Sequence, residues 1–492
     1  MNLGFSDEGF TTSVPLKRQV SKVQILSPVN PSLASGVDPP QLVRQITKHL
    51  PNAQHFSVES STGYQSENRA NQNALVNVLM IGTGEYTTGY VNGSASSSDK
   101  SAGVVALAML DMKARGIIGR VGLCGVNGTK FPGIRTHMRS VFSKYAGLSE
   151  LVSQCETWPA DDSKDEVAYL QAIKSYTRGD VAIVFTPDDT HFDIALACIR
   201  HGMHVLVTKP VVKTLREHAI LHTEAQKSNV LVCVEVHKRW DPMYSDARDK
   251  IQTLGKFSFL HSYMSQPKHQ LETFRAWAGT KSDISYYLNS HHIDFHEWCV
   301  GQNARPTKVT AMASTGVAKE LYHLDCEDTI TLSVEWENLN AEYQLASVGT
   351  AVYTASWVAA KSDVHSQQRF FYMGHGGEIN IDQAHRGYTM SDDQHGYKSV
   401  NPLFMKYTPT EGKFSGQLGY GYRSFSAFIE AVSSINQGIS HVDDFAHSLA
   451  SISSTYRTTA VLEAGRRALT EKRCISILYE NKEFPCLPTK LA

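Results

Sequence analysis

The chain has 492 residues, with 47 lysines and arginines against 48 aspartates and glutamates, and a formal net charge of -1. At about 100 to 200 residues per domain, this length predicts two or three domains with cores of their own. The balanced charge gives no electrostatic reason to expect nucleic acid or an anionic membrane as a partner.

The sequence contains no run of 18 apolar residues. Its first ten residues are polar and acidic, whereas a secretory signal is basic and then apolar, so we expect a cytoplasmic protein. The eight cysteines lie far apart with no C-x-x-C pair. We therefore expect reduced thiols in the core and no metal site.

Residues 1–74 are rich in turn-forming residues and are predicted to form an N-terminal arm. From Val76 the character changes, because residues 76–81 form an apolar run typical of a strand buried on both faces. Four more such runs alternate with helical patterns. The predicted strands are 76–81, 120–124, 181–185, 204–207 and 230–236, and the predicted helices are 104–115, 165–176, 191–201 and 215–228. This alternation predicts a doubly wound α/β domain with a parallel sheet over residues 75–240.

After Asp241-Pro242 the pattern changes to apolar and polar residues in alternation, which predicts an antiparallel sheet covered on one face. The predicted strands are 257–264, 306–315, 328–335, 342–348 and 368–373. Residues 422–469 are predicted to be helical, apart from a break near Gly438. Residues 241–492 are therefore predicted to form an α+β domain.

Gly82-Thr83-Gly84 directly follows the first strand. Glycines in this position permit a tight turn and a close approach of the backbone to a pyrophosphate. The usual G-x-G-x-x-G spacing is broken, because four residues that begin with Glu85 and Tyr86 separate Gly84 from Gly89. A serine-rich insertion over residues 90–103 then delays the next helix.

The second strand ends in Cys124-Gly125-Val126-Asn127-Gly128-Thr129-Lys130. An NAD-selective site normally places a carboxylate here to bind the ribose hydroxyls, and this segment has none. Thr129, Lys130 and Arg135 are candidates to accept a 2′-phosphate instead. The cofactor is therefore predicted to be NAD or NADP, with NADP favoured.

The endings of the next two strands are the most specific part of the sequence. One is Thr186-Pro187-Asp188-Asp189-Thr190-His191 and the other is Thr208-Lys209-Pro210. Here the chain resembles the Gfo/Idh/MocA family of NAD(P)-dependent oxidoreductases, whose strands end in T-P-x-x-x-H and E-K-P. Thr208 stands where the family has Glu. The resemblance continues at Arg239-Trp240-Asp241-Pro242 and at His291-His292-Ile293-Asp294, and covers about residues 76–479.

The resemblance implies a fold class: an N-terminal Rossmann domain with a parallel sheet, followed by an α+β domain with a large, mostly antiparallel open sheet. It also implies that a set of motif residues lines the cofactor site. With the glycine turn and the end of the second strand, the predicted cofactor-binding residues are Gly82, Gly84, Glu85, Tyr86, Asn127, Thr129, Lys130, Thr186, Pro187, His191, Lys209 and Pro210.

Oxidation of a secondary alcohol by hydride transfer leaves a proton to remove, so a base must reach the hydroxyl. Lys209, at the carboxyl end of a parallel strand, is predicted to polarise or deprotonate it. The resemblance implies that His291 is the acid or base. The family commonly has a carboxylate four residues before this histidine, where the chain has Tyr287. A phenol titrates near pH 10 and does not replace a carboxylate as a base, so we expect Tyr287 to orient the substrate.

Further polar residues in these segments are predicted to bind substrate beside Lys209: His237, Arg239, Asn289 and His292. The predicted function is hydride transfer between NAD or NADP and a sugar, inositol or related polyol. Two alternatives stay open: an NAD-dependent enzyme that cleaves glycosides, and a non-catalytic regulator that binds dinucleotide. The resemblance also implies that residues 241–492 bind the substrate and mediate oligomerisation into a homodimer or homotetramer.

Overall fold

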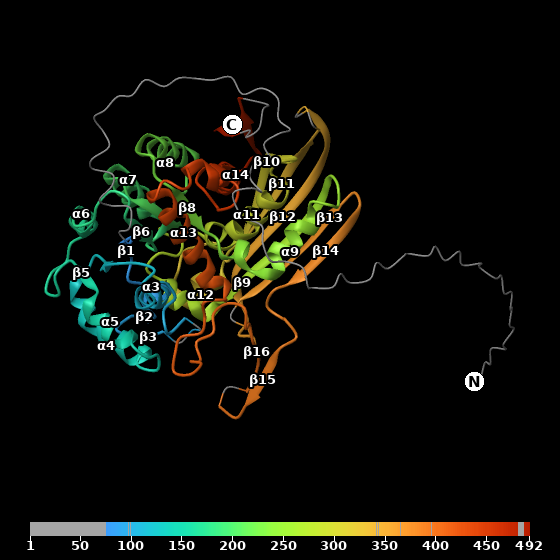
Figure 1. Ribbon diagram of the computed structural model, residues 1–492. Coiled ribbons are helices and arrows are strands. Elements are labelled where there is room, and N and C mark those ends of the chain that lie inside the picture. Colours follow the sequence, from blue (N-terminus) through green and yellow to red (C-terminus); the bar gives the residue numbers. More distant parts are fainter. Residues whose placement is uncertain are drawn as a thin grey trace, which may run out of the picture. The chain divides into compact units, whose positions relative to one another are not determined.

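A computed structural model describes residues 75–480 and 487–492, apart from the single positions 97, 99, 341, 343, 365 and 395. The predicted N-terminal arm lies outside the described residues. The described chain contains two large sheets, each with its own layer of helices (Figure 1).

The first sheet is parallel, and its strand order is β5-β4-β1-β6-β7-β8. In chain order its strands are β1 (Val78–Ile81), β4 (Val121–Cys124), β5 (Glu156–Trp158), β6 (Val181–Val184), β7 (His204–Thr208) and β8 (Val232–Glu235). All four residues of β1 are buried, as the apolar run predicts for a strand that is covered on both faces. The order of strands is that of a Rossmann fold, with its switch point between β1 and β6.

Helices cover both faces of this sheet. They are α2 (Glu85–Thr88), α3 (Val105–Ala114), α4 (Phe131–Phe142), α5 (Leu148–Leu151), α6 (Ala168–Lys174), α7 (His191–His201) and α8 (Leu215–Ser228). Local signals explain their ends: Thr214 and Glu217 form a capping box at the start of α8, and Gly202 ends α7 in the left-handed conformation. The predictions for α7 and α8 match the observed bounds, whereas α4 and β5 were not predicted.

The second sheet has eight strands in the order β14-β13-β9-β12-β11-β10-β17-β18. They are β9 (Phe257–Pro267), β10 (Ala304–Ser314), β11 (Thr329–Leu339), β12 (Leu345–Ala359), β13 (Gln367–Gly374), β14 (Gly377–Asp382), β17 (Ile475–Tyr479) and β18 (Pro488–Leu491). Only β9 and β12 pair in parallel; the other neighbours in this sheet are antiparallel. The predicted fold class is therefore confirmed.

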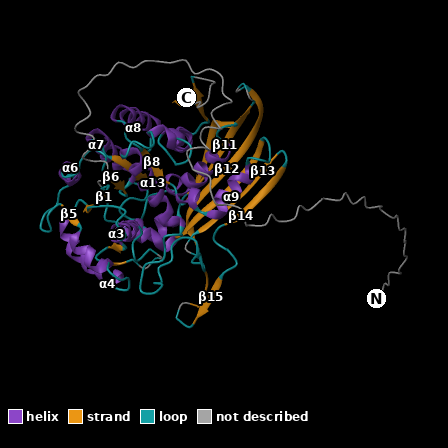
Figure 2. Cartoon of the chain, in the orientation of Figure 1, coloured by secondary structure: helices purple, strands orange, loops and turns teal. Residues whose placement is uncertain are grey.

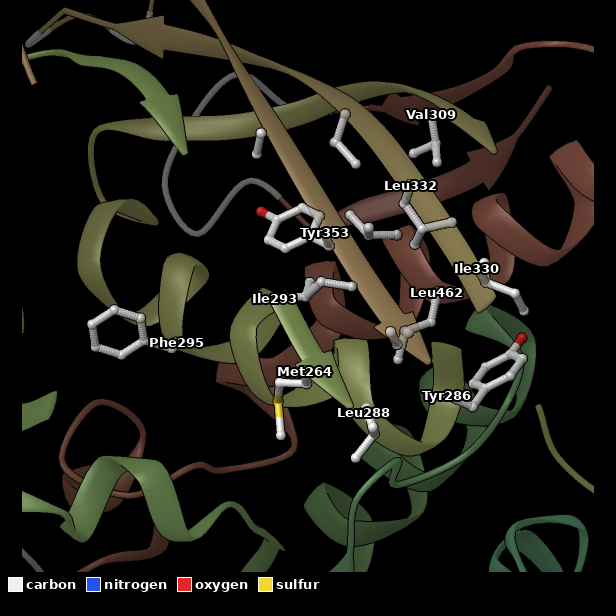
Figure 3. Packing of buried hydrophobic residues seen from close by; sticks show 14 of the residues in the cluster. Met264, Tyr286, Leu288, Ile293, Phe295, Val309, Ile330, Leu332, Tyr353 and Leu462 are labelled. Atoms are coloured by element: carbon white, nitrogen blue, oxygen red, sulfur yellow. The ribbon is translucent and has the colours of Figure 1, made fainter. Parts of the chain in front are cut away.

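One face of the eight-stranded sheet packs against helices, which lie to one side of it in Figure 2. The main ones are α9 (Pro242–Ile251), α11 (Ser290–Val300) and α14 (Tyr456–Glu471), with the shorter α10 (Leu271–Phe274) and α12 (Val317–Tyr322) nearby. Figure 3 shows the resulting core, in which Leu332 and Tyr353 of the sheet face Ile293 of α11 and Leu462 of α14.

Short elements connect these layers. They are the hairpins β2 (Tyr90–Val91) with β3 (Ser94–Ala95) and β15 (Thr389–Asp392) with β16 (Gly396–Ser399), the 3-10 turns η2 (Gly128–Lys130), η3 (Val152–Gln154), η4 (Asp188–Thr190), η5 (His237–Trp240), η6 (Lys268–Gln270), η8 (Val442–Phe445) and η9 (Ser453–Thr455), and the π-helical turn η7 (Ser285–Asn289). Helix α13 (Tyr420–Asn436) lies late in the chain, yet its Phe425 and Phe428 pack with Met80 of β1. The division of the chain at residue 240 remains a prediction.

Candidate active site

The glycine turn after β1 is shaped by contact with the end of β6. Gly82 has a φ of +115°, and a Cβ there would lie 2.0 Å from the carbonyl oxygen of Phe185. Only glycine fits such a position. Gly84 is different, because a Cβ on it would have no neighbour within 4 Å. The backbone at Gly84 is thus open to a phosphate, and the turn fits the dinucleotide cradle that the sequence predicts.

The two predicted residues after this turn contact neighbouring loops. Glu85 accepts a hydrogen bond from the Ser96 hydroxyl of the serine-rich insertion. The Tyr86 ring stacks on Phe185, with 5.1 Å between ring centroids and 5° between planes. The insertion therefore packs on the glycine turn and borders the predicted phosphate site.

The loop after β4 presents the residues predicted to select the cofactor. Asn127 organises it, because its side-chain oxygen accepts hydrogen bonds from the backbone nitrogen of Thr129 at 3.1 Å and from the Thr129 hydroxyl at 2.8 Å. Thr129 and Lys130 are exposed. Arg135 forms an ion pair with Asp161.

His191 ties together the loops that follow β6 and β7. One ring nitrogen lies 2.8 Å from the carbonyl oxygen of Pro210, and the other lies 2.8 Å from that of Thr186. The ring is completely buried. This contact holds the predicted Thr186-Pro187 and Lys209-Pro210 segments side by side at the carboxyl edge of the sheet.

Lys209 directly follows β7, and its side chain reaches the π-helical turn η7. Its ammonium group donates a hydrogen bond to the backbone carbonyl of Tyr287 and lies 4.0 Å from the centroid of the Tyr287 ring. Burial lowers the pKa of Lys209 to about 8, although the carboxylates of Asp188 and Glu235 oppose this effect. An amine with this pKa exchanges protons readily near neutral pH.

His291 lies one turn of helix beyond Tyr287 and belongs to the same site. Its ring packs against His237 with 4.8 Å between centroids, and His237 in turn stacks on Tyr420 at 5.5 Å. Burial, followed by the positive charge of Lys209, lowers the pKa of His291 well below its usual range, so the imidazole is neutral. Among the described residues, its Nδ1 atom has no hydrogen-bond partner. A buried nitrogen of this kind suits a ligand hydroxyl.

The structure thus brings together Lys209, Tyr287, His291 and His237. The other predicted substrate residues contact buried protein groups. Arg239 makes two hydrogen bonds to Asp294, at 2.7 and 3.0 Å. His292 lies 3.2 Å from the Tyr244 hydroxyl, and Asn289 donates to the Ser285 hydroxyl at 3.0 Å.

Sequence reasoning did not identify three charged residues around this site: Asp188, Glu235 and Lys238. Lys238 is completely buried, and its ammonium group donates to Tyr244 at 2.8 Å, Gln368 at 2.7 Å and Gln383 at 2.5 Å. Glu235 had a recognisable signal, because it is the one carboxylate in the apolar strand 230–236.

Within the described ranges, no three His, Cys, Asp or Glu side chains are grouped so that they could hold a metal ion. Nor does any helix in these ranges combine the length and apolar character needed to cross a membrane.

The residues of the first sheet match a known protein family. Residues 76–236 match the profile of the Gfo/Idh/MocA oxidoreductase family with an NAD-binding Rossmann fold. The scyllo-inositol 2-dehydrogenase (NADP(+)) IolW of Bacillus subtilis is 29% identical over 182 residues, which are 36% of this chain and 50% of that protein. Inositol 2-dehydrogenase 2 of Saccharopolyspora erythraea is 31% identical over 162 residues, 32% of this chain and 45% of that protein. The chain thus spans about half the length of the curated relatives it matches.

Solved structures share the fold over both sheets. Scyllo-inositol dehydrogenase from Lactobacillus casei, with bound NAD(H) and scyllo-inositol, has a TM-score of 0.54 at 14% identity and covers 82% of this chain and 99% of its own. An inositol dehydrogenase homologue from Azotobacter vinelandii, complexed with NADH and myo-inositol, has a TM-score of 0.56 at 16% identity and covers 82% and 98%. At these identities the likeness concerns the fold.

Proposed function

We propose that the protein transfers a hydride between a nicotinamide dinucleotide and a secondary alcohol of a sugar, inositol or related polyol, because residues 76–236 match the profile of the Gfo/Idh/MocA oxidoreductase family. The observation that carries this proposal is the hydrogen bond from Lys209, at the carboxyl edge of the parallel sheet, to the carbonyl of Tyr287, which lies one helical turn before His291. The inositol dehydrogenases among its relatives support a cyclic polyol as the substrate class.

The chain's own residues would handle the proton of this reaction. Lys209 in its neutral form takes the proton of the substrate hydroxyl on its Nζ atom. The ring of Tyr287 stabilises the resulting ammonium group through a cation–π contact, and the Tyr287 carbonyl accepts one of its hydrogens. His291 offers its free Nδ1 to a second hydroxyl or to the same oxygen. When bound, the nicotinamide ring supplies the hydride acceptor or donor.

We propose NADP as the preferred cofactor. Exposed Thr129 and Lys130 follow β4, and the segment 125–130 carries no carboxylate that would repel a 2′-phosphate. The NADP-dependent relative from Bacillus subtilis supports this choice. The test compares kcat/KM for NADP and NAD, and Lys130→Ala should lower it for NADP alone. An equal loss with both cofactors would contradict the proposed role of Lys130.

Lys209→Ala tests the reaction itself. With a panel of polyols, the absorbance of the reduced nicotinamide should report turnover by the wild type, and the variant should lose about 100-fold or more of kcat. Cofactor affinity, measured by fluorescence titration, should be retained. Lys213→Ala is the matched control, because Lys213 donates to the carbonyl of Lys281 and has no part in the proposed reaction.

Three outcomes would contradict the proposal. Full turnover by the Lys209 variant would remove this residue from the reaction. Glycoside cleavage without a net change in absorbance would favour the glycoside-cleaving alternative. Tight cofactor binding with no turnover on any substrate would favour the regulatory one.

A further inference from the structure

Tyr420 is a buried residue of the candidate site to which the proposed reaction gives no role. It is the first residue of α13 and is only 3% exposed. Its ring stacks on His237 with 18° between planes, and the edge of the Phe404 ring meets it at 5.4 Å between centroids. His237 packs in turn on His291. The phenol is therefore held firmly, and a single imidazole ring separates it from His291.

Two side-chain amides donate hydrogen bonds to the phenol oxygen of Tyr420. The Nε2 atom of Gln383 lies 3.2 Å from this oxygen, and the Nδ2 atom of Asn401 lies 2.9 Å from it. The other end of each amide fixes its orientation. The Gln383 Oε1 atom accepts from the ammonium group of Lys238 at 2.5 Å, and the Asn401 Oδ1 atom accepts from the backbone nitrogen of Leu403 at 3.2 Å. Because these two groups only donate, each amide must turn its NH2 group towards the phenol.

The hydrogen of the Tyr420 hydroxyl is the part that this arrangement leaves over. The oxygen already accepts two hydrogen bonds, so the remaining capacity of the hydroxyl is to donate its own hydrogen. Among the described residues the hydroxyl makes no other hydrogen bond, and none of them accepts this hydrogen. A buried donor without an acceptor is unfavourable, which makes an oxygen atom of a ligand a suitable partner.

The neighbouring imidazole rings offer further polar atoms to the same ligand. His237 is partly exposed and makes no hydrogen bond to another described residue. The Nδ1 atom of His291 is likewise without a partner in this part of the chain. Three groups that can each bind one oxygen therefore follow one another from His291 to Tyr420. A molecule with several hydroxyl groups could use all three, whereas a simple alcohol could use only one.

We propose that Tyr420 binds the substrate and determines specificity, because its hydroxyl donates a hydrogen bond to a polyol oxygen that does not react. This inference deepens the proposed function and rests on it. The carbon that reacts lies at Lys209 and His291 in that proposal, and His237 lies between His291 and Tyr420. The oxygen bound by Tyr420 therefore belongs to another carbon of the polyol. Such a contact is made equally in the ground state and the transition state, so it affects KM and not kcat.

Steady-state kinetics with a matched set of substrates tests this contact. The set consists of myo-inositol and its monodeoxy analogues, each of which lacks one hydroxyl group. For the wild type, one analogue with an intact reacting carbon should have a KM about 10-fold higher than that of myo-inositol. Tyr420→Phe should raise the KM for myo-inositol by about 10-fold, keep kcat within about twofold, and no longer discriminate against that analogue.

A second variant removes the hydrogen bond and keeps the phenol. In Asn401→Asp a carboxylate takes the place of the amide and accepts the hydrogen of Tyr420, while Leu403 can still donate to it. This variant should raise KM as Tyr420→Phe does. Tyr422→Phe is the matched control, because this buried tyrosine of the same helix already donates to Asp111 at 2.8 Å. Its KM should not change. Circular dichroism checks that each variant is folded, and Asn401→Asp provides the test if Tyr420→Phe is not.

Equal discrimination against every analogue by the wild type and by Tyr420→Phe would overturn the inference. So would a loss of kcat at unchanged KM, which would indicate a structural effect on the reacting groups. If the wild type oxidises no polyol, the proposed function is refuted, and calorimetric titration of myo-inositol in the presence of NADPH decides the inference. Weaker binding by Tyr420→Phe than by the wild type would leave it standing, whereas equal affinity or no binding by the wild type would overturn it.

Discussion

At the scale of single residues, the glycine turn makes the sharpest stability prediction. Gly82→Ala puts a methyl group against the Phe185 carbonyl and a side chain at a φ of +115°. The backbone conformation alone should cost about 1–3 kcal/mol of the free energy of unfolding. Gly84→Ala adds the same methyl group in open space and should change the free energy of unfolding by less than about 1 kcal/mol. Urea titration of both variants checks this, and equal losses would contradict it.

Tyr287 contacts the predicted catalytic lysine although it has no carboxylate. Its backbone carbonyl accepts a hydrogen bond from Lys209, and its ring lies against the same ammonium group. The ring belongs to an aromatic cluster with Phe274, Trp277 and Trp357. Burying a carboxylate against these rings is costly, which is a physical reason for an uncharged side chain at this position.

At the scale of elements, the packing of α8 on α14 depends on a neutral histidine. His218 is completely buried on α8, and its ring nitrogens lie 2.8 Å from the Thr459 hydroxyl and 2.6 Å from the Ile452 carbonyl. Burial lowers its pKa from 6.5 to about 4. Between these two values the unfolded chain binds a proton at this histidine that the folded chain does not bind. The free energy of unfolding therefore decreases as the pH falls from about 6.5 towards 4.

The His218→Gln variant isolates this effect. Over that pH range this histidine should lower the free energy of unfolding of the wild type by about 1.4 kcal/mol per pH unit. The variant lacks this contribution, so its free energy of unfolding should depend less steeply on pH. The measurement is the free energy of unfolding from urea titration at several pH values. His441→Gln, at the residue before η8, is the control, because this side chain is 63% exposed. A slope that does not change in the His218 variant would refute the argument.

Element prediction from the sequence was most accurate where local signals were strong. Helices α7 and α8 have the expected bounds because a left-handed Gly202 and a Thr214 capping box set their ends. Strand β5 has three residues, and α4 begins directly after a 3-10 turn, so neither produced a long periodic pattern. Strand β12 extends far beyond its predicted end at residue 348, to Ala359.

At the scale of the whole molecule, we predict a homo-oligomer formed through the face of the large sheet that lies away from the helices. Phe259 and Phe371 lie there with 6.4 Å between ring centroids, and Met373, which pairs with Phe259, is 37% exposed. Exposed apolar side chains grouped in this way favour burial against another surface.

Light scattering tests this prediction. The wild type should have the mass of a dimer or tetramer, and Met373→Glu should shift it towards the monomer, because burying a carboxylate against apolar side chains is costly. Met390→Glu, on the separate β15–β16 hairpin and 44% exposed, is the control and should leave the mass unchanged. A monomeric wild type would refute the prediction.

The sequence by itself determined most of the strands and helices of the first sheet, though not α4 and β5, together with the glycine turn and the strand endings that carry Thr186 and Lys209. Periodicity and turn chemistry act over a few neighbouring residues, so the sequence shows them directly. Only the tertiary structure decided what Lys209 contacts. Its ammonium group donates a hydrogen bond to the carbonyl of Tyr287, 78 residues later in the chain, and lies over the ring of the same residue. Such contacts join residues far apart in the chain, so they depend on how the layers pack and leave no local pattern to read.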